Sequence, residues 1–369
     1  MLPWLARRLA YSLLLLFVLA SAVFFAVRLA PGDPLDQVVN EEVTAADRAL
    51  LRQRLGLDRS LPEQYAHWLT GAVRGDFGLS LRQQRPVADV VGDALGPTLQ
   101  LTLVSYVLHL ALAVATALAL AARRRRAGAA WLEGTGLVFY SVPAFWLGLM
   151  FILLFSRQLG WFPAGGFAGP DAAFLPAGAR LVDRLRHLAL PVLTLTLSTF
   201  MGTTRYLQAA LEEVLAEDYI LAARARGLPE DRILRRHALR NALLPLITLV
   251  GLSLPWLVGG ALVVETVFGW PGLGRVTIEA VWARDYTVIM ATTVLAGAAV
   301  VAGSTLADLL YRRADPRVRA AGPDGGLRGA TCRHGEGAAP PRSARPDPGR
   351  GADGGLGRGR GGGAPARAR

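Results

Sequence analysis

Residues 217–245, EDYILAARARGLPEDRILRRHALRNALLP, form a polar, arginine-rich segment between two runs that are apolar enough to lie in lipid. The segment predicts two short helices, because acidic residues stand near the start of each helix and basic residues near its end, as the helix dipole favours. Gly227 stands where a left-handed C-terminal cap is expected, and Pro229 begins the second helix. The sequence therefore predicts a helix-turn-helix elbow over residues 212–245 that leaves the membrane at one face.

The composition around this elbow is that of a multi-pass membrane protein. The chain has 369 residues, of which 52% are hydrophobic, with a formal net charge of +12 and a mean hydropathy of +0.35. All 40 basic residues are arginine. A P-loop needs a lysine on the nucleotide phosphates, so we expect any ATP chemistry to come from another subunit. The single cysteine, Cys332, predicts neither an internal disulfide nor a cysteine metal site.

Six apolar runs are long enough to cross a bilayer, at residues 9–27, 98–122, 131–155, 188–206, 242–264 and 286–310. Arginines cluster beside these runs at Arg7 and Arg8, in the quartet 123–126 and from Arg312 onward, and Arg28 also follows the first run. The positive-inside rule then places both termini and the elbow in the cytoplasm. The predicted fold class is an all-α polytopic membrane protein with six transmembrane helices and a cytoplasmic elbow between the fourth and fifth.

The first run has an alternative interpretation. Ala20, Ser21 and Ala22 resemble a signal-peptide cleavage site behind a basic start. The apolar run continues past them, as membrane anchors do, so we interpret residues 1–28 as an N-terminal segment with the first membrane helix.

The remaining organisation follows from composition. Residues 29–97 are polar and predict an external loop that can hold short helices. Residues 98–319 hold the main membrane domain, with further external loops at 157–187 and 265–285. Residues 320–369 are rich in Gly, Arg, Pro and Ala, which predicts a disordered tail. An RNA-binding tail is the alternative, but no aromatic residues interleave its arginines, and no nucleic-acid partner is expected.

Several polar side chains lie within the apolar runs. Hydroxyl groups are candidates for lining a solute pathway, although Ser and Thr also commonly bond their own or a neighbouring helix; the candidates are Thr194, Ser198, Ser253 and Thr292. His109 is a metal-ligand type, but one histidine is not a metal site, and we expect it to pack against a polar neighbour. Asp308 is expected to pair with Arg312 one helical turn on.

Many stretches, taken in order, resemble the inner-membrane permease subunits of ATP-binding-cassette importers, in the branch that moves dipeptides, oligopeptides and nickel. The resemblance runs from residue 6 to about residue 319 and rests on RLAPGDP (28–34), LGLD (55–58), QY (64–65), Trp68, RGDFG (74–78), SVPAFWLG (141–148), LGWFP (159–163), DY (218–219), AARARG (222–227), HALRNALLP (237–245), ETVFGWPGLG (265–274), RDY (284–286) and DPR (315–317).

The resemblance implies that the elbow is the motif by which such permeases dock on their ATPase. The coupling residues it implies are Asp218, Tyr219, Ala222, Ala223, Gly227, His237, Arg240, Asn241 and Pro245. Leu221 stands where the generic motif has glutamate, so a salt bridge from that position is not expected here.

The resemblance also implies the function and the partners. The chain would be a subunit without enzyme activity or cofactor in the plasma (inner) membrane of a prokaryote. Surrounded by membrane lipid, it would form a pathway for di- or oligopeptides with a second, homologous permease subunit. A solute-binding protein would deliver the peptide, and two ATPase subunits would bind ATP. Nickel or another small solute is the alternative substrate.

Two other classes of function are weighed against this one. A secondary transporter would ordinarily place more ionisable groups at mid-membrane. A membrane-embedded hydrolase is disfavoured because the sequence contains neither His-Glu-x-x-His nor Gly-x-Ser-x-Gly.

Overall fold

The computed structural model describes residues 2–29, 45–54, 56–122, 127–243, 246, 253 and 261–314. All of them lie within the compact unit Met1–Ala320. In this part of the chain the residues form helices and turns, with one isolated bridge between Leu79 and Pro86 and no strand. The predicted tail and most of the predicted fifth span lie outside the described residues.

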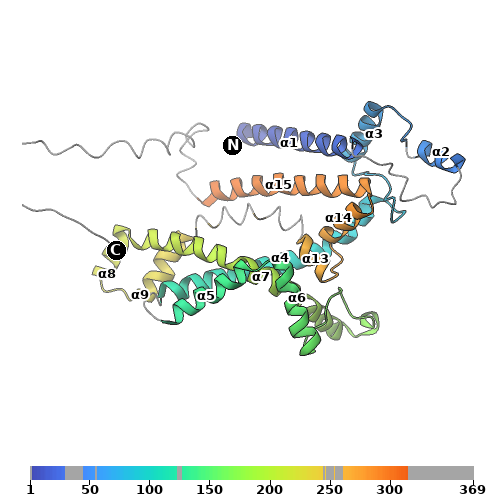
Figure 1. The fold of residues 1–369 in the computed structure, drawn as a ribbon. Coiled ribbons are helices and arrows are strands. Elements are labelled where there is room, and N and C mark those ends of the chain that lie inside the picture. Colours follow the sequence, from blue (N-terminus) through green and yellow to red (C-terminus); the bar gives the residue numbers. More distant parts are fainter. Residues whose placement is uncertain are drawn as a thin grey trace, which may run out of the picture. The chain divides into compact units, whose positions relative to one another are not determined.

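The helical elements carry the labels of Figure 1. In chain order they are α1 (Leu2–Leu29), α2 (Ala45–Arg54), α3 (Leu61–Val73), α4 (Val87–Ala122), α5 (Ala127–Ser141), α6 (Ala144–Phe151), the π-helix η2 (Ile152–Gln158), the 3₁₀ turn η3 (Ala172–Phe174), α7 (Ala177–Leu215), α8 (Asp218–Ala225), α9 (Glu230–Arg232), the π-helix η4 (Ile233–Ala238), α10 (Leu239–Ala242), α13 (Leu262–Val267), α14 (Leu273–Trp282) and α15 (Tyr286–Ala314).

Three described helices are long and apolar enough to cross a membrane, namely Ala6–Leu29, Val87–Ala122 and Tyr286–Leu306. They correspond to the first, second and sixth predicted spans. The helix of the second predicted span, α4, begins at Val87 rather than near residue 98. The polar residues before residue 98 predict that the span begins there, whereas α4 begins 11 residues earlier and contains Pro97. The earlier residues also bury an apolar side, with Val87, Val90 and Ala94.

The third predicted span is not one straight helix. Residues 130–141 and 144–158 together are apolar enough to span, but they meet at an angle of 104°. The break falls at Pro143, which the sequence places between Val142 and the start of α6. Proline lacks an N–H and disfavours helix at the residue before it, so the bend has a local cause. Counting this bent pair as one span gives up to four spans among the described residues.

The fourth predicted span, residues 188–206, lies within α7, a helix of 39 residues. α7 packs along α4 with the starts of the two helices together. Near the starts, Leu101 of α4 shares a buried cluster with Leu188 and Leu195. Near the ends, Ala117 shares another cluster with Leu207 and Leu211 of α7. The two helices therefore run parallel.

α1 and α15 pack antiparallel. A Cβ atom on Gly297 would meet Leu19, and Arg8 forms an ion pair of 2.9 Å with Asp308. The first turns of α1 and the last turns of α15 therefore lie at the same end of the pair, which is also seen in Figure 1. Asp308 thus pairs with Arg8; the side chain of Arg312, its predicted partner, lies outside the described residues.

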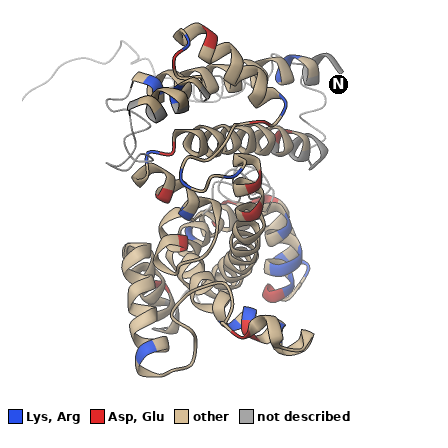
Figure 2. Ribbon diagram, turned by 90° about the vertical axis from the view of Figure 1, so that its right-hand side faces the viewer, with Lys and Arg blue, Asp and Glu red and all other residues tan. Residues whose placement is uncertain are grey.

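Charge is concentrated away from the middles of the long helices. Figure 2 shows long ribbons that are mostly tan, with acidic and basic residues gathered near helix ends and in the connections. Apolar side chains along α1 remain exposed, including Leu13, Leu15 and Phe17. Lipid or another apolar surface is the environment that such helices require.

Candidate functional site

The elbow consists of α8, a tight turn, and a second arm made of α9, η4 and α10. Gly227 has φ of 78°, in the left-handed region that favours glycine. Its N–H donates to the Arg224 carbonyl at 2.9 Å, and the Leu228 N–H donates to the Ala223 carbonyl at 3.3 Å. This pair of bonds is a Schellman cap. The predicted left-handed cap at Gly227 is confirmed.

Two side-chain contacts join the arms of the elbow. Arg224 donates from Nε and Nη2 to the two carboxylate oxygens of Glu230 at 3.2 and 2.6 Å, and this hydrogen-bonded partner lowers the pKa of Glu230. Asn241 donates from Nδ2 to the Tyr219 hydroxyl at 2.6 Å. Because one contact lies at the turn and the other joins α8 to α10, they fix the angle between the arms.

The two alanines of the predicted docking motif have different environments. Ala223 is buried against Ile220 and Ile233, which join the two arms in one apolar cluster with Leu228. Ala222 is exposed. The exposed face of α8 holds Asp218, Tyr219, Leu221 and Ala222.

The second arm places the other predicted coupling residues. His237 is half-buried in η4 and its carbonyl accepts from Asn241 at 3.3 Å, while Arg240 is exposed. Pro245 lies outside the described residues. The elbow therefore brings Tyr219, Asn241 and His237 together, and it leaves Arg240 at the surface.

The second arm is packed onto the ends of α4 and α7. Leu234, Ala238 and Ala242 share one buried cluster with Ala117 of α4 and with Leu207 and Leu211 of α7. The inner side of the second arm thus belongs to the core, whereas α8 is attached to it mainly through the contacts within the elbow. This arrangement is suited to receive a partner on α8 and to connect that partner with α4 and α7.

A cavity of about 260 Å³ lies between the middles of α4 and α7. Its polar lining consists of Ser105, Tyr106, His109, Thr199, Thr203 and Ser253. His109 lies between two threonine hydroxyls, with Nδ1 at 2.7 Å from Thr199 and Nε2 at 2.8 Å from Thr203. The expected polar neighbour of His109 is therefore present.

The predicted pathway residues differ in their positions. Ser253 lines the cavity. The other three bond the backbone of their own helices: Thr194 donates to Leu190, Ser198 to Leu195, and Thr292 to Val288. Sequence reasoning missed Tyr106 and Ser105, because a tyrosine and a serine in an apolar run give no signal until the partner helix is known.

A second buried polar centre lies near the starts of α4 and α7, around Glu265. Its side chain is fully buried and accepts from the Thr98 hydroxyl at 2.9 Å and from the Arg275 N–H at 3.2 Å. Thr98 in turn accepts from the Leu273 N–H at 2.7 Å. The ETVFGWPGLG stretch, 265–274, is thereby folded back on its own first residue.

Glycines of this stretch leave room for the buried carboxylate. A Cβ atom on Gly272 would overlap Glu265 and Thr98, and one on Gly274 would lie 2.5 Å from the Leu262 Cα. Trp270, also fully buried, donates from its indole to the Pro97 carbonyl at 2.9 Å. The stretch is thus sealed onto the start of α4 by both polar and aromatic contacts.

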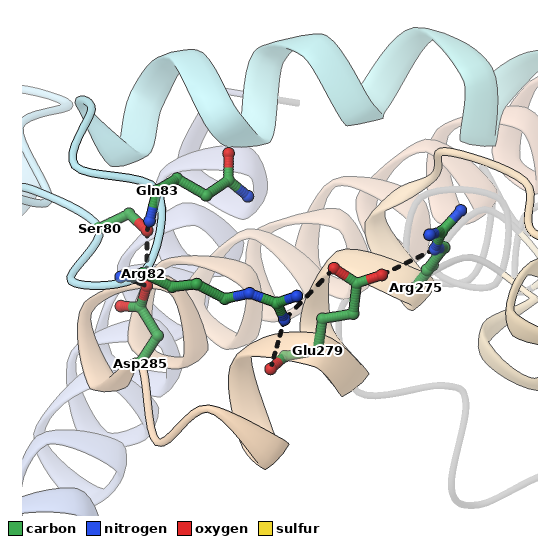
Figure 3. A network of polar contacts seen from close by, with 6 residues as sticks. All are labelled: Ser80, Arg82, Gln83, Arg275, Glu279 and Asp285. Carbon is green, nitrogen blue, oxygen red and sulfur yellow. Dashed lines mark hydrogen bonds and ion pairs between the residues drawn. The ribbon is translucent and has the colours of Figure 1, made fainter. Parts of the chain in front are cut away.

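Next to it, a polar network joins the hairpin-like segment 79–86 to α14 and the start of α15 (Figure 3). Asp285 is buried and accepts from the Ser80 hydroxyl at 2.5 Å and from the Arg82 N–H at 3.2 Å. Glu279 lies between Arg82, at 3.4 Å, and Arg275, at 2.7 Å. The network connects residues about 200 positions apart in the sequence, so sequence spacing gave no signal for it.

The apolar helices define a multi-pass membrane protein with an elbow exposed at one end of α4 and α7. Residues 1–102 match the N-terminal family of binding-protein-dependent transport system membrane components, and residues 111–320 match the family described as "Binding-protein-dependent transport system inner membrane component". The chain belongs to this family of inner-membrane transport components.

Two similar transport proteins match this chain over nearly their whole length. The oligopeptide transport system permease protein AppB of Bacillus subtilis (strain 168) is 38% identical over 319 residues, which is 86% of this chain and 99% of AppB. The glutathione transport system permease protein GsiC of Escherichia coli (strain K12) is 37% identical over 323 residues, with the same coverage. A chain of the MetNI methionine ABC transporter matches 61% of this chain, and 96% of its own length, with a TM-score of 0.47 and 20% identity.

We expect the Gly274→Ala substitution to destabilise the protein by about 1–3 kcal/mol, because the added methyl group overlaps backbone atoms of Leu262 that cannot rotate away. The control is Gly134→Ala in α5, where a Cβ atom meets nothing within 4 Å. Alanine there is expected to be neutral or to stabilise the helix by up to about 1 kcal/mol. Thermal unfolding of the purified protein in detergent measures both, and equal melting temperatures for the two variants would contradict the packing described.

Proposed function

We propose that this chain is a permease subunit of an ATP-driven importer of di- or oligopeptides. The peptide substrate is supported by the relatives, whose names describe oligopeptide and glutathione transport. The observation that carries the energy-coupling part is the elbow: it presents an exposed helix, α8, on a second arm that is buried against α4 and α7.

In this proposal the chain supplies the pathway and other subunits supply the energy. A second, homologous permease completes the pathway, and two ATPase subunits bind ATP and dock on α8. An extracytoplasmic solute-binding protein delivers the peptide. The absence of lysine from the sequence supports this division, since a P-loop cannot be built here in its usual form. Asp218, Tyr219, Ala222, Ala223, Gly227, His237, Arg240, Asn241 and Pro245 form the coupling elbow.

The proposed topology has six spans with both termini and the elbow in the cytoplasm. The parallel packing of α4 and α7 supports it, as does the ion pair that brings the first turns of α1 to the last turns of α15. The arginines beside the elbow and at the two termini favour the cytoplasmic face.

Purification of the tagged chain from membranes tests the subunit composition. We expect mass spectrometry to find ATPase subunits and one homologous permease in stoichiometric amounts, and we expect the reconstituted complex with its binding protein to take up radiolabelled di- or tripeptides in an ATP-dependent manner. A chain that purifies alone and drives uptake with an ion gradient would overturn the proposal. Uptake of nickel without peptide uptake would overturn the proposed peptide substrate but not the proposed subunit composition.

Gly227→Val tests the coupling role. Valine is a β-branched residue that strongly disfavours a φ of 78°, so we expect the Schellman cap to open and α8 to change its angle. Peptide uptake per ATP hydrolysed should fall at least about ten-fold, while the amount of protein in the membrane stays unchanged.

The matched control is Gly75→Val. Gly75 has φ of 81° and, like Gly227, no atom within 4 Å of an added Cβ, but it lies in the predicted external loop. The same backbone strain there should leave the ratio of uptake to ATP hydrolysis near that of the wild type. If both variants have the same ratio of peptide uptake to ATP hydrolysis, the proposed coupling role of Gly227 is wrong.

Cysteine labelling tests the topology. In a Cys332→Ser background, Ala216→Cys at the start of the elbow and Ala173→Cys in the predicted external loop provide exposed positions. A membrane-impermeant maleimide added to intact spheroplasts should label the Ala173→Cys variant, whereas the Ala216→Cys variant should require permeabilised membranes. Labelling of both variants in intact cells would contradict a cytoplasmic elbow.

A further inference from the structure

The cavity between α4 and α7 is lined by both hydrogen-bonding groups and apolar side chains. Of the nine described residues that line it, six carry a hydroxyl or an imidazole, and three are leucines. The Tyr106 ring stacks on the His109 ring with centroids 5.8 Å apart, and its hydroxyl bonds to Ser253. None of the nine lining residues is acidic or is an arginine.

The hydrogen bonds around His109 define which groups donate. Thr199 has one hydroxyl hydrogen, and it donates to the Leu195 carbonyl at 2.7 Å. Toward His109 the Thr199 oxygen is therefore an acceptor, so Nδ1 carries the proton. In the neutral ring Nε2 then accepts from the Thr203 hydroxyl at 2.8 Å. With the ring neutral, the Nε2 bond to Thr203 can be exchanged for a bond to a ligand.

The size of the cavity limits what can occupy it. Pockets for whole drug-sized ligands have volumes of roughly 300–1,000 Å³. A cavity of about 260 Å³ is too small for an oligopeptide, but it accommodates one amino-acid side chain. A charged side chain would lack a counter-charge among the described lining residues, and burying an unpaired charge is costly. An uncharged side chain with a hydrogen-bonding group meets both the polar and the apolar walls.

We propose that this cavity is a subsite of the transport pathway that binds one uncharged side chain of a peptide in transit, with Thr203, His109 and Tyr106 as its hydrogen-bonding groups. The inference rests on the proposed function, because it requires that the transported solute is a peptide. It adds a location within the membrane and a preference for uncharged side chains, and it assigns a binding role to Thr203, which lies one helical turn from Thr199 on α7.

The transport test uses the complete reconstituted complex with its solute-binding protein. Tripeptides Ala-X-Ala, with X as Gln, Leu, Glu or Lys, are compared at equal occupancy of the binding protein. In the Thr203→Val variant we expect uptake of the Gln peptide relative to the Leu peptide to fall about five-fold, the loss expected for one hydrogen bond. The control Thr194→Val removes a buried hydroxyl of the same helix that donates to the Leu190 carbonyl and is not among the described residues that line the cavity, so this ratio should stay unchanged.

A binding test does not depend on turnover. In the Cys332→Ser background, the Thr203→Cys variant is labelled with a small thiol reagent in the assembled complex, with and without millimolar Ala-Gln-Ala. We expect the peptide to slow labelling at least about three-fold, and we expect Ala-Glu-Ala to slow it less. The Ala216→Cys variant, in the elbow, should be labelled at the same rate in each case.

The outcomes separate the two proposals. If the wild-type complex shows no ATP-dependent peptide uptake, the proposed function and the subsite are both overturned. If the wild type transports peptides, but Thr203→Val keeps the wild-type Gln to Leu ratio and the Thr203→Cys variant is unprotected or unreactive, only the subsite is overturned.

Discussion

The packing of α4 against α7 is the interaction on which the other features depend. Close contact between the helices is maintained along their length by apolar clusters and by threonines of α7 that reach carbonyls of α4. Thr196 donates to the Ser105 carbonyl at 3.3 Å, and the Thr204 hydroxyl, which donates to Phe200 of its own helix at 2.9 Å, lies 3.5 Å from the Ala113 carbonyl. Hydrogen bonds between membrane helices contribute only about 0.6–2 kcal/mol each, so no single bond holds the pair. What holds it is the repetition of small contacts, which also fixes the register that places His109 opposite Thr199 and Thr203.

Within the elbow, apolar burial outweighs charge. The Arg224–Glu230 pair is well exposed, with side-chain exposures of 39% and 63%, and exposed ion pairs contribute about 0–1 kcal/mol. Burying Ile220 and Ile233 completely contributes about 1.5–3 kcal/mol for each side chain. The ion pair therefore orients the arms, whereas the seam through Ala223 holds them together. This explains why only one of the two motif alanines is buried: Ala223 belongs to the seam, and Ala222 belongs to the exposed face.

Local features of the fold could be predicted from the sequence, and features that depend on distant pairing could not. The cap at Gly227 and the helix starting after Pro229 follow from the chemistry of single residues, and both are present. The break at Pro143 was visible as a proline, but its 104° angle depends on packing. The polar residues before Thr98 led to a predicted loop, whereas they form the first turns of α4. Asp285 and Ser80, 205 residues apart, carried no sequence signal for their contact because nothing local specifies it.

In the proposed transporter, the α4–α7 pair would transmit a movement from the elbow to the cavity over a short distance. One end of the pair holds the second arm of the elbow, the middle holds the cavity, and the other end contacts Trp270 beside the buried Glu265. Closely packed helices respond to a displacement by shifting between discrete arrangements rather than by deforming smoothly. Because Ala117, Ala238 and Ala242 have small side chains, the second arm packs close to α4 and α7. No long, flexible side chain of these three residues lies between the arm and the helices. A movement of α8 on its ATPase would therefore reach Thr203 as a shift of α7 relative to α4, and it would change the distance between the hydroxyls and His109 on which the cavity is built.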